Sequence, residues 1–306
     1  VRGWDTRFGS QTVKEGHGID LQSPSVAAIR RQNAVALGKT AMSELGWKAV
    51  TDSPLTGTSR NPWNRDLTCG GSSGGNAIAL ATGMCSLALG SDIGGSVRIP
   101  ASFCGTVGLK PTQDLAPVRK EAKTGLLLHS GLMARTVEDV ALGLDALGIR
   151  HPRRSSRTRQ TTHYSEALAE DVEDLRVAVS PGLGIVDVDS EIESSVREAG
   201  HTLELLGAWV TEVDPGLEDP TDLYTALYAP GIALDIQRIP EERRGEVDPG
   251  LRATAEAGQR ISGTQVMEAL QERRELMARL GRLHLHYDVL LTATVAVPPF
   301  PVDREV

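Results

Sequence analysis

Two clusters rich in glycine and serine, at residues 69–76 and 90–100, constrain the fold of this chain more than any other feature. An apolar run at 77–81 predicts a compact helix between them, and a second run at 86–89 predicts a buried strand. A helix followed by a strand lets the chain return, so the two clusters can meet. Glycine lets a backbone approach its neighbours closely, which makes the meeting point a candidate site for binding or catalysis.

The rest of the chain alternates between predicted helices and strands. We expect helices from Pro24 onward, from a cap at Thr136 to about Leu147, over about 188–206 and near 263–285, and strands at 34–37, 175–179, 209–213 and 288–291. A polar stretch at 150–170 reads as a connector. Strands that alternate with helices favour an α/β protein built on one large sheet.

Charge and cysteine content limit the partners that we expect. The chain has 32 basic and 40 acidic residues and a formal net charge of −8, so nucleic acid is not an expected partner. The first 150 residues hold 16 basic and 12 acidic residues, and the remainder holds 16 and 28. The three cysteines, Cys69, Cys85 and Cys104, fit neither a disulfide framework nor a zinc site, which favours a reduced, cytoplasmic protein.

Membrane and cofactor signals are also missing from the sequence. No basic segment followed by an apolar segment opens the chain, so we expect no signal peptide. The longest uncharged run, between Asp66 and Asp92, is too polar to span a bilayer. No ligand cluster predicts a metal, and we expect no organic cofactor.

Two short motifs give weak signals. Gly38-Lys39-Thr40 resembles the end of a phosphate-binding loop, but Asn33 stands where that loop needs its first glycine. Residues 71–75 match G-x-S-x-G with Ser73 as nucleophile, the pattern of an α/β-hydrolase esterase with a distant histidine. The segment before this match does not read as the buried strand that such an elbow needs, so the esterase stays an alternative.

Taken together, these segments resemble the amidase signature family. The resemblance is carried by Gly38–Glu44, Asn61–Trp63, Cys69–Asn76, Gly90–Thr112, Gly131–Asp139 and, less strongly, Tyr287–Thr292. Within Gly131–Asp139, Leu132 replaces the proline of the family's G-P-M-A-R-T-x-E-D motif. The resemblance implies the amidase-signature fold, a large mixed β-sheet covered by helices on both faces.

The same resemblance implies amide hydrolysis by a Ser–cis-Ser–Lys triad. Ser96 is then the nucleophile and Ser72 the bridging serine, which follows a cis peptide bond. A neutral lysine draws the Ser96 proton through Ser72, and Ser96 attacks the amide carbon to give an acyl-enzyme and ammonia or an amine. The other residues implied are Ile93, Gly94 and Gly95 as oxyanion-hole donors, and Ser73, Asp92 and Arg98 as supporting residues.

This chain departs from the family pattern at the catalytic lysine. It precedes a Gly-Ser turn that Trp4–Ser10 resembles, which puts the lysine a few residues before Val1 and outside this chain. We therefore expect one amidase-signature domain over 1–306, incomplete at both ends. Residues 1–148 are its signature and catalytic region, and 149–306 its substrate-cleft and peripheral region. Without the lysine, we expect the chain to be inactive or nearly so.

Alternatives to a stand-alone amidase remain open. One is the A-type subunit of a tRNA-dependent amidotransferase, which shares these motifs. Another is a catalytically inactive fragment or pseudoenzyme that keeps only the scaffold. The expected partner is a small-molecule amide, whose identity the sequence does not give. A homodimer is the base-rate expectation for the oligomeric state.

Overall fold

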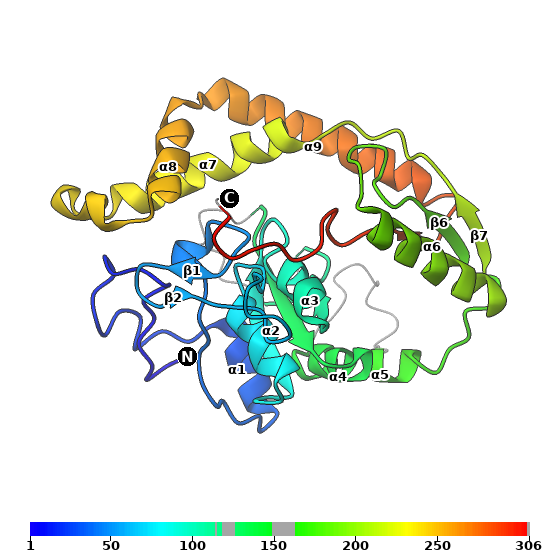
Figure 1. Cartoon of the computed structure of the whole chain (residues 1–306), viewed down its shortest axis with the longest axis horizontal. Coiled ribbons are helices and arrows are strands. Elements are labelled where there is room, and N and C mark those ends of the chain that lie inside the picture. Colours follow the sequence, from blue (N-terminus) through cyan, green and yellow to red (C-terminus); the bar gives the residue numbers. More distant parts are fainter. Residues whose placement is uncertain (114, 118–125, 149–162, 305–306) are drawn as a thin grey trace, which may run out of the picture. The chain divides into compact units, whose positions relative to one another are not determined.

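The structure is a computed structural model that describes residues 1–113, 115–117, 126–148 and 163–304 (Figure 1). The predicted connector at 150–170 lies mostly outside these residues. The chain divides into two compact units. The first comprises Val1–Ala169, Gly231–Glu256 and Pro299–Val306, and the second comprises Glu170–Pro230 and Ala257–Pro298.

The first unit is built on an antiparallel sheet. Its strands are β3 (Leu87–Asp92), β5 (His129–Ala134) and β4 (Val107–Leu109), in the order β3-β5-β4. The described helices of this unit include α1 (Pro24–Arg31), α2 (Gly74–Ala81), α3 (Arg98–Cys104) and α4 (Val137–Ala146). β5 lies at the centre and pairs with both other strands, so its side chains define the two faces of the sheet.

Successive side chains of β5 point alternately into two apolar cores. Met133 is fully buried in a cluster with α2 and α3 residues such as Leu80 and Ala101. Its neighbours Leu132 and Ala134 belong to a different cluster, with residues of α1 and α4. Successive strand side chains point to opposite faces, so helices cover both faces of this sheet.

Glycines in the sheet let α3 approach it closely. Gly90 of β3 pairs with Gly131 of β5, and both face the fully buried side chain of Val97. A Cβ at Gly90 would lie 2.8 Å from Val97 Cγ2, and one at Gly131 would lie 2.7 Å from it. At Gly108 of β4, a Cβ would lie 2.7 Å from Ala101 Cβ. We call this glycine-lined hollow, formed by Gly90, Gly108 and Gly131, the α3 seat.

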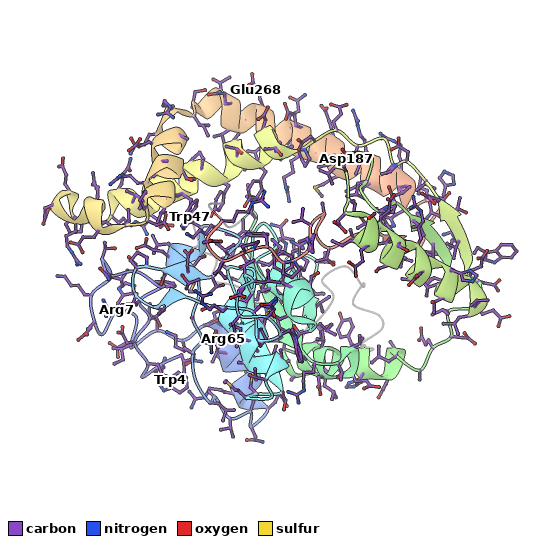
Figure 2. All side chains as sticks on the ribbon, viewed as in Figure 1. Trp4, Arg7, Trp47, Arg65, Asp187 and Glu268 are labelled. Atoms are coloured by element: carbon purple, nitrogen blue, oxygen red, sulfur yellow. The ribbon has the colours of Figure 1, made fainter. Side chains whose placement is uncertain are left out.

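A buried carboxylate joins distant segments of the first unit. Glu44, in η1 (Glu44–Gly46), is fully buried and accepts hydrogen bonds from Ser10 Oγ at 2.6 Å and from the Asp248 amide at 2.7 Å. Lys48 also pairs with Asp248, at 2.8 Å. Trp47, labelled in Figure 2, lies so close to Gly250 that a Cβ there would be 2.4 Å from its ring. These contacts hold segments around residues 10, 44 and 248 together.

The second unit contains a parallel sheet in the order β7-β6-β8. Its strands are β6 (Arg176–Val179), β7 (Trp209–Glu212) and β8 (Val289–Leu291). Between β6 and β7, α6 (Ser190–Leu205) packs Val196 against Val177 and Val179. Asp189 caps α6 by accepting a hydrogen bond from the Glu191 amide, which satisfies one of the free donors of its first turn.

The remaining elements are short strands and peripheral helices. They are β1 (Asp52–Ser53), β2 (Gly57–Thr58), α5 (Tyr164–Ala167), α7 (Thr221–Gln237), η2 (Glu241–Glu246), α8 (Pro249–Arg260) and α9 (Gly263–Leu283). Ser262 and Gln265 form a reciprocal capping box at the start of α9. Among the helices that the structure describes, none combines the length and the apolar character needed to cross a membrane.

Most predicted elements are confirmed, and one predicted strand is wrong. The β-α-β unit is present as β6-α6-β7, and Thr136 caps α4 through the Asp139 amide. The strand predicted at 34–37 does not form, since Val35 and Leu37 are 80% and 70% exposed and no ladder pairs them. The α/β class is confirmed, and the described strands are hydrogen-bonded in three sheets. The two three-stranded sheets lie in different units, and no described ladder joins them.

The α3 seat predicts a strong effect of adding one methyl group. Gly131→Ala places a Cβ 2.7 Å from Val97 Cγ2 and 3.0 Å from the Leu109 carbonyl oxygen, so the packing must shift. We expect the free energy of unfolding to fall by about 1–3 kcal/mol, measured by urea denaturation. Gly38→Ala is the matched control, because a Cβ at Gly38 meets nothing within 4 Å. Equal stability of the two variants would contradict the close packing.

Candidate active site

The two glycine- and serine-rich clusters meet, as the reversal of the chain predicts. The Ser73 amide donates a hydrogen bond to the Ser96 carbonyl at 3.0 Å. The peptide bond between Gly71 and Ser72 is cis, as the resemblance implies. Ser72 is 3% exposed, and Ser96 is partly exposed. No hydrogen bond between the Ser72 and Ser96 hydroxyls occurs in the part of the chain that the structure describes, so the two serines lie on joined segments without a direct link.

Asp92 organises the turn that carries Ser96. This residue ends β3 and is fully buried. Its Oδ1 accepts a hydrogen bond from the Gly95 amide at 2.9 Å, and its Oδ2 accepts one from the Val97 amide at 3.1 Å. The Arg98 guanidinium binds the same carboxylate in a bidentate manner, at 2.9 and 2.7 Å. The carboxylate therefore fixes the backbone on both sides of Ser96.

The pKa of Asp92 lies below its ordinary value of 3.8. Burial alone would raise it, because a charged carboxylate loses solvation inside the protein. The hydrogen bond and charge of Arg98, together with the Gly95 and Val97 amides, outweigh this effect and favour the ionised form. Asp92 is thus a charged structural group at neutral pH. The supporting role expected for Asp92 and Arg98 stays a prediction.

The structure revises the expected set of oxyanion-hole donors. The Gly95 N–H points to Asp92, so it is already engaged and is not a free donor here. For Ile93 and Gly94, no protein acceptor takes the N–H within the described residues, so these two groups stay available. Gly95 instead serves the turn itself, since its φ of +105° is one that side chains rarely adopt. We retain Ile93 and Gly94 as candidate donors.

Backbone contacts also hold the segment around Ser72. A Cβ at Gly71 would lie 2.5 Å from the Val50 carbonyl carbon, so this segment packs directly on the backbone beneath it. The buried Thr51 hydroxyl contacts backbone groups of the same segment. Asn76 connects α2 to two neighbours: its Nδ2 donates to the Leu89 carbonyl at 3.0 Å, and its Oδ1 accepts from Thr40 at 2.7 Å. Neither Thr51 nor Asn76 stands out in the sequence as a structural residue, since threonine and asparagine are ordinary in a polar loop.

No described lysine is bound to either serine. Lys48 pairs with Asp52 and Asp248, and these carboxylates raise its pKa against the lowering effect of burial, so it stays protonated. Lys39 donates to the Asp5 carbonyl and to Thr6 Oγ1. Lys110 donates to the Pro111 carbonyl, and burial and the charge of Arg98 lower its pKa. In the described part of the chain, the contacts of Lys39, Lys48 and Lys110 therefore identify none of them as the base of the expected triad.

Neither buried cysteine is suited to act as the nucleophile. Burial raises the pKa of the Cys69 thiol to about 11 and that of the Cys104 thiol to about 12. Both thiols are therefore protonated and poorly nucleophilic at neutral pH. All three cysteines are free.

The esterase alternative lacks its structural context. Ser73 is the N-cap residue of α2, and it is preceded by a loop with isolated bridges where a nucleophile elbow has a strand. Within the described residues, no group of three or more His, Cys, Asp or Glu side chains is arranged to hold a metal ion.

Comparison with known proteins identifies similar sequences. The model of the family described as Amidase matches residues 1–306. An acylamidase of Rhodococcus erythropolis is 36% identical over 308 residues, which cover 99% of this chain and 64% of that protein. The A-type subunit of the glutamyl-tRNA(Gln) amidotransferase of Methanosarcina mazei is 37% identical over 214 residues, covering 70% of this chain and 45% of that protein.

Solved structures give the same result. A bacterial aryl acylamidase described as one of the amidase signature enzymes superposes with a TM-score of 0.89 at 27% identity, covering 98% of this chain and 65% of that one. A 6-aminohexanoate cyclic dimer hydrolase superposes with a TM-score of 0.86, also at 27% identity, covering 99% of this chain and 66% of that one. The chain thus spans just under two thirds of the length of the acylamidase and of the aryl acylamidase.

The lowered pKa of Asp92 predicts a pH dependence of stability. A carboxylate whose pKa is depressed by folding contributes stability above its unfolded pKa, near 3.8, and loses that contribution as the pH falls through the folded pKa. We expect Asp92→Asn to be less stable than the native chain at pH 7. The difference in unfolding free energy should shrink as the pH falls from about 4. Urea denaturation between pH 3 and 7 measures both effects.

The matched control for this titration is Asp66→Asn. Asp66 is exposed, so its substitution should change the free energy of unfolding little. A constant difference between the native chain and Asp92→Asn over the whole pH range would contradict the assigned role of the Asp92 charge.

Proposed function

Since the chain belongs to the amidase signature family, we propose that it carries the serine residues of an enzyme that hydrolyses small-molecule carboxylic amides. The observation that supports this most directly is the junction of the two clusters. The bond from the Ser73 amide to the Ser96 carbonyl brings the nucleophile turn against the segment that contains Ser72.

In this proposal Ser96 is the nucleophile and Ser72 relays its proton. As the Ser96 oxygen bonds to the amide carbon, its proton passes to Ser72, whose own proton passes to the base. The N–H groups of Ile93 and Gly94 stabilise the negative charge that develops on the substrate oxygen. Cleavage of the C–N bond returns a proton to the departing nitrogen and leaves an acyl-enzyme. Water then attacks this ester, releases the acid and regenerates Ser96.

The base in this proposal is a lysine outside residues 1–306. The turn at Trp4–Ser10 supports this placement, since it resembles the family segment that follows the lysine. The contacts of three described lysines support it as well. Lys48 pairs with Asp52 and Asp248. Lys39 donates hydrogen bonds to Asp5 and Thr6, and Lys110 donates one to Pro111. Because the relatives are longer than this chain, the activity proposed is that of a protein that includes further residues.

The substrate class that we propose is an acylated amine, including aryl amides. The support is the likeness over almost the whole chain to an acylamidase and to an aryl acylamidase. No metal or organic cofactor enters the proposed chemistry, because serine, lysine and water account for every proton and bond. We also propose a cytoplasmic location, which the three free cysteines support.

The first prediction of this proposal concerns the 306-residue chain alone. We expect no amide turnover above background and no labelling of Ser96 by a fluorophosphonate probe, because the base is missing. Mass spectrometry of the probe-treated chain locates any adduct. Turnover or labelling that Ser96→Ala abolishes would overturn the proposal that the base is a lysine outside residues 1–306. Lys14→Ala and Lys110→Ala would then test two of the six lysines that the chain contains.

A second experiment supplies the proposed catalytic lysine. The chain is extended upstream of Val1 with the residues that its own reading frame encodes, and hydrolysis of an anilide is followed. We expect turnover that falls by at least about a thousandfold in Ser96→Ala and in the variant of the added lysine, because each residue acts as part of one unit. Ser86→Ala, at an exposed serine, should be neutral. Hydrolysis of glutamine but not of anilides would favour the amidotransferase alternative, and no activity would favour a pseudoenzyme.

A further inference from the structure

Thr51 is a buried residue with an unusual number of contacts to the segment around Ser72. It is 1% exposed and immediately precedes β1. Its hydroxyl lies 2.9 Å from the Gly70 carbonyl oxygen and 3.3 Å from the Ser72 carbonyl oxygen. It also accepts a hydrogen bond from the Gly74 amide at 2.9 Å. One hydroxyl thus contacts backbone groups before, at and after the bridging serine.

The donor and acceptor capacity of a hydroxyl matches this arrangement. A threonine hydroxyl has one proton to donate and two lone pairs to accept with. The proton goes to Gly70 at the shorter distance and is partly shared with Ser72, while a lone pair receives the Gly74 N–H. A buried backbone group that loses its partner costs about 1–3 kcal/mol, so the hydroxyl and the segment constrain each other.

The two segments pack tightly against each other. A Cβ at Gly71 would lie 2.5 Å from the Val50 carbonyl carbon, and a Cβ at Gly74 would lie 2.4 Å from Thr51 Oγ1. Thr51 is itself held in place, because its carbonyl accepts a hydrogen bond from the Ser59 amide at 2.8 Å. The hydroxyl therefore connects a fixed segment to the segment that must place Ser72.

We propose that Thr51 is the positioning residue of the bridging serine: its hydroxyl, bound to Gly70, Ser72 and Gly74, sets where the Ser72 hydroxyl stands relative to Ser96. This inference rests on the proposed amide hydrolysis for its catalytic consequence. The structural part of the inference, that Thr51 holds the segment around Ser72 in place, rests on the contacts of Thr51 alone. The relay requires the Ser72 oxygen to lie within hydrogen-bond reach of two partners, so a small displacement of its backbone interrupts proton transfer.

Hydrogen exchange of the 306-residue chain tests the structural part without any need for activity. Thr51→Val keeps the shape of the side chain and removes the hydroxyl, so the Gly74 amide loses its acceptor. We expect amides in peptides covering residues 70–76 to exchange about tenfold faster than in the native chain. Thr51→Ser retains the hydroxyl and should restore native exchange. Thr58→Val, at an exposed threonine of β2, is the matched control and should have no effect.

Steady-state kinetics of the upstream-extended chain test the catalytic part. We expect Thr51→Val to lower kcat for an anilide by about 10- to 100-fold, with KM changed less than about threefold, because positioning for proton transfer is lost and not substrate binding. Thr51→Ser should recover kcat to within about threefold. A merely destabilising substitution would lower the amount of folded enzyme and would not be rescued selectively in kcat.

The outcomes separate this inference from the proposed function. Native exchange in Thr51→Val, or equal impairment of Thr51→Ser and Thr51→Val, overturns the role of Thr51. Faster exchange combined with an inactive native extended chain overturns the proposed function and leaves the structural part supported. If Thr51→Val does not fold, Thr51→Ser against Thr51→Ala decides, since only the former keeps the hydroxyl, and native exchange in both variants overturns the inference.

Discussion

The close approach of α3 to its sheet is the constraint on which the position of Ser96 depends. Val97 fills a hollow that exists only because facing positions of β3 and β5 are glycines. The residue before Val97 is Ser96, so seating one side chain fixes the backbone of the other. Interiors packed at this density transmit small changes of volume to their neighbours. The sheet thus positions the Ser96 turn through van der Waals contact at Val97 and through the carboxylate of Asp92, which ends β3.

The buried charge beside this turn has both a benefit and a cost. Asp92 holds the backbone on either side of Ser96, yet it occupies the Gly95 N–H that the family resemblance predicted as an oxyanion-hole donor. A negative group near a developing oxyanion would also oppose it electrostatically. The bidentate Arg98 offsets this charge, since the pair is close to neutral as a unit. The carboxylate therefore fixes the turn without leaving an uncompensated negative charge beside it.

Sequence patterns predicted the elements whose signals are local. The Thr136 cap of α4 and the β-α-β unit follow from capping chemistry and periodicity over a few residues. The run at 34–37 has the same apolar composition as a strand, but nothing in it indicates whether a partner strand is within reach, and Val35 and Leu37 are exposed. The division into separate sheets depends on pairings between distant residues. Likewise, no sequence signal distinguishes a glycine amide bound to a carboxylate from one left free for a substrate.

The buried Glu44 carries a consequence for the order of events during synthesis. Its two hydrogen-bond donors lie at Ser10 and at Asp248, and the latter is 204 residues further along the chain. At roughly 5–20 residues per second, a ribosome needs about 10–40 s to add that stretch. During this interval the carboxylate has only one of its two donors and stays hydrated. The full set of hydrogen bonds around Glu44 is therefore completed only once the chain has been made as far as Asp248.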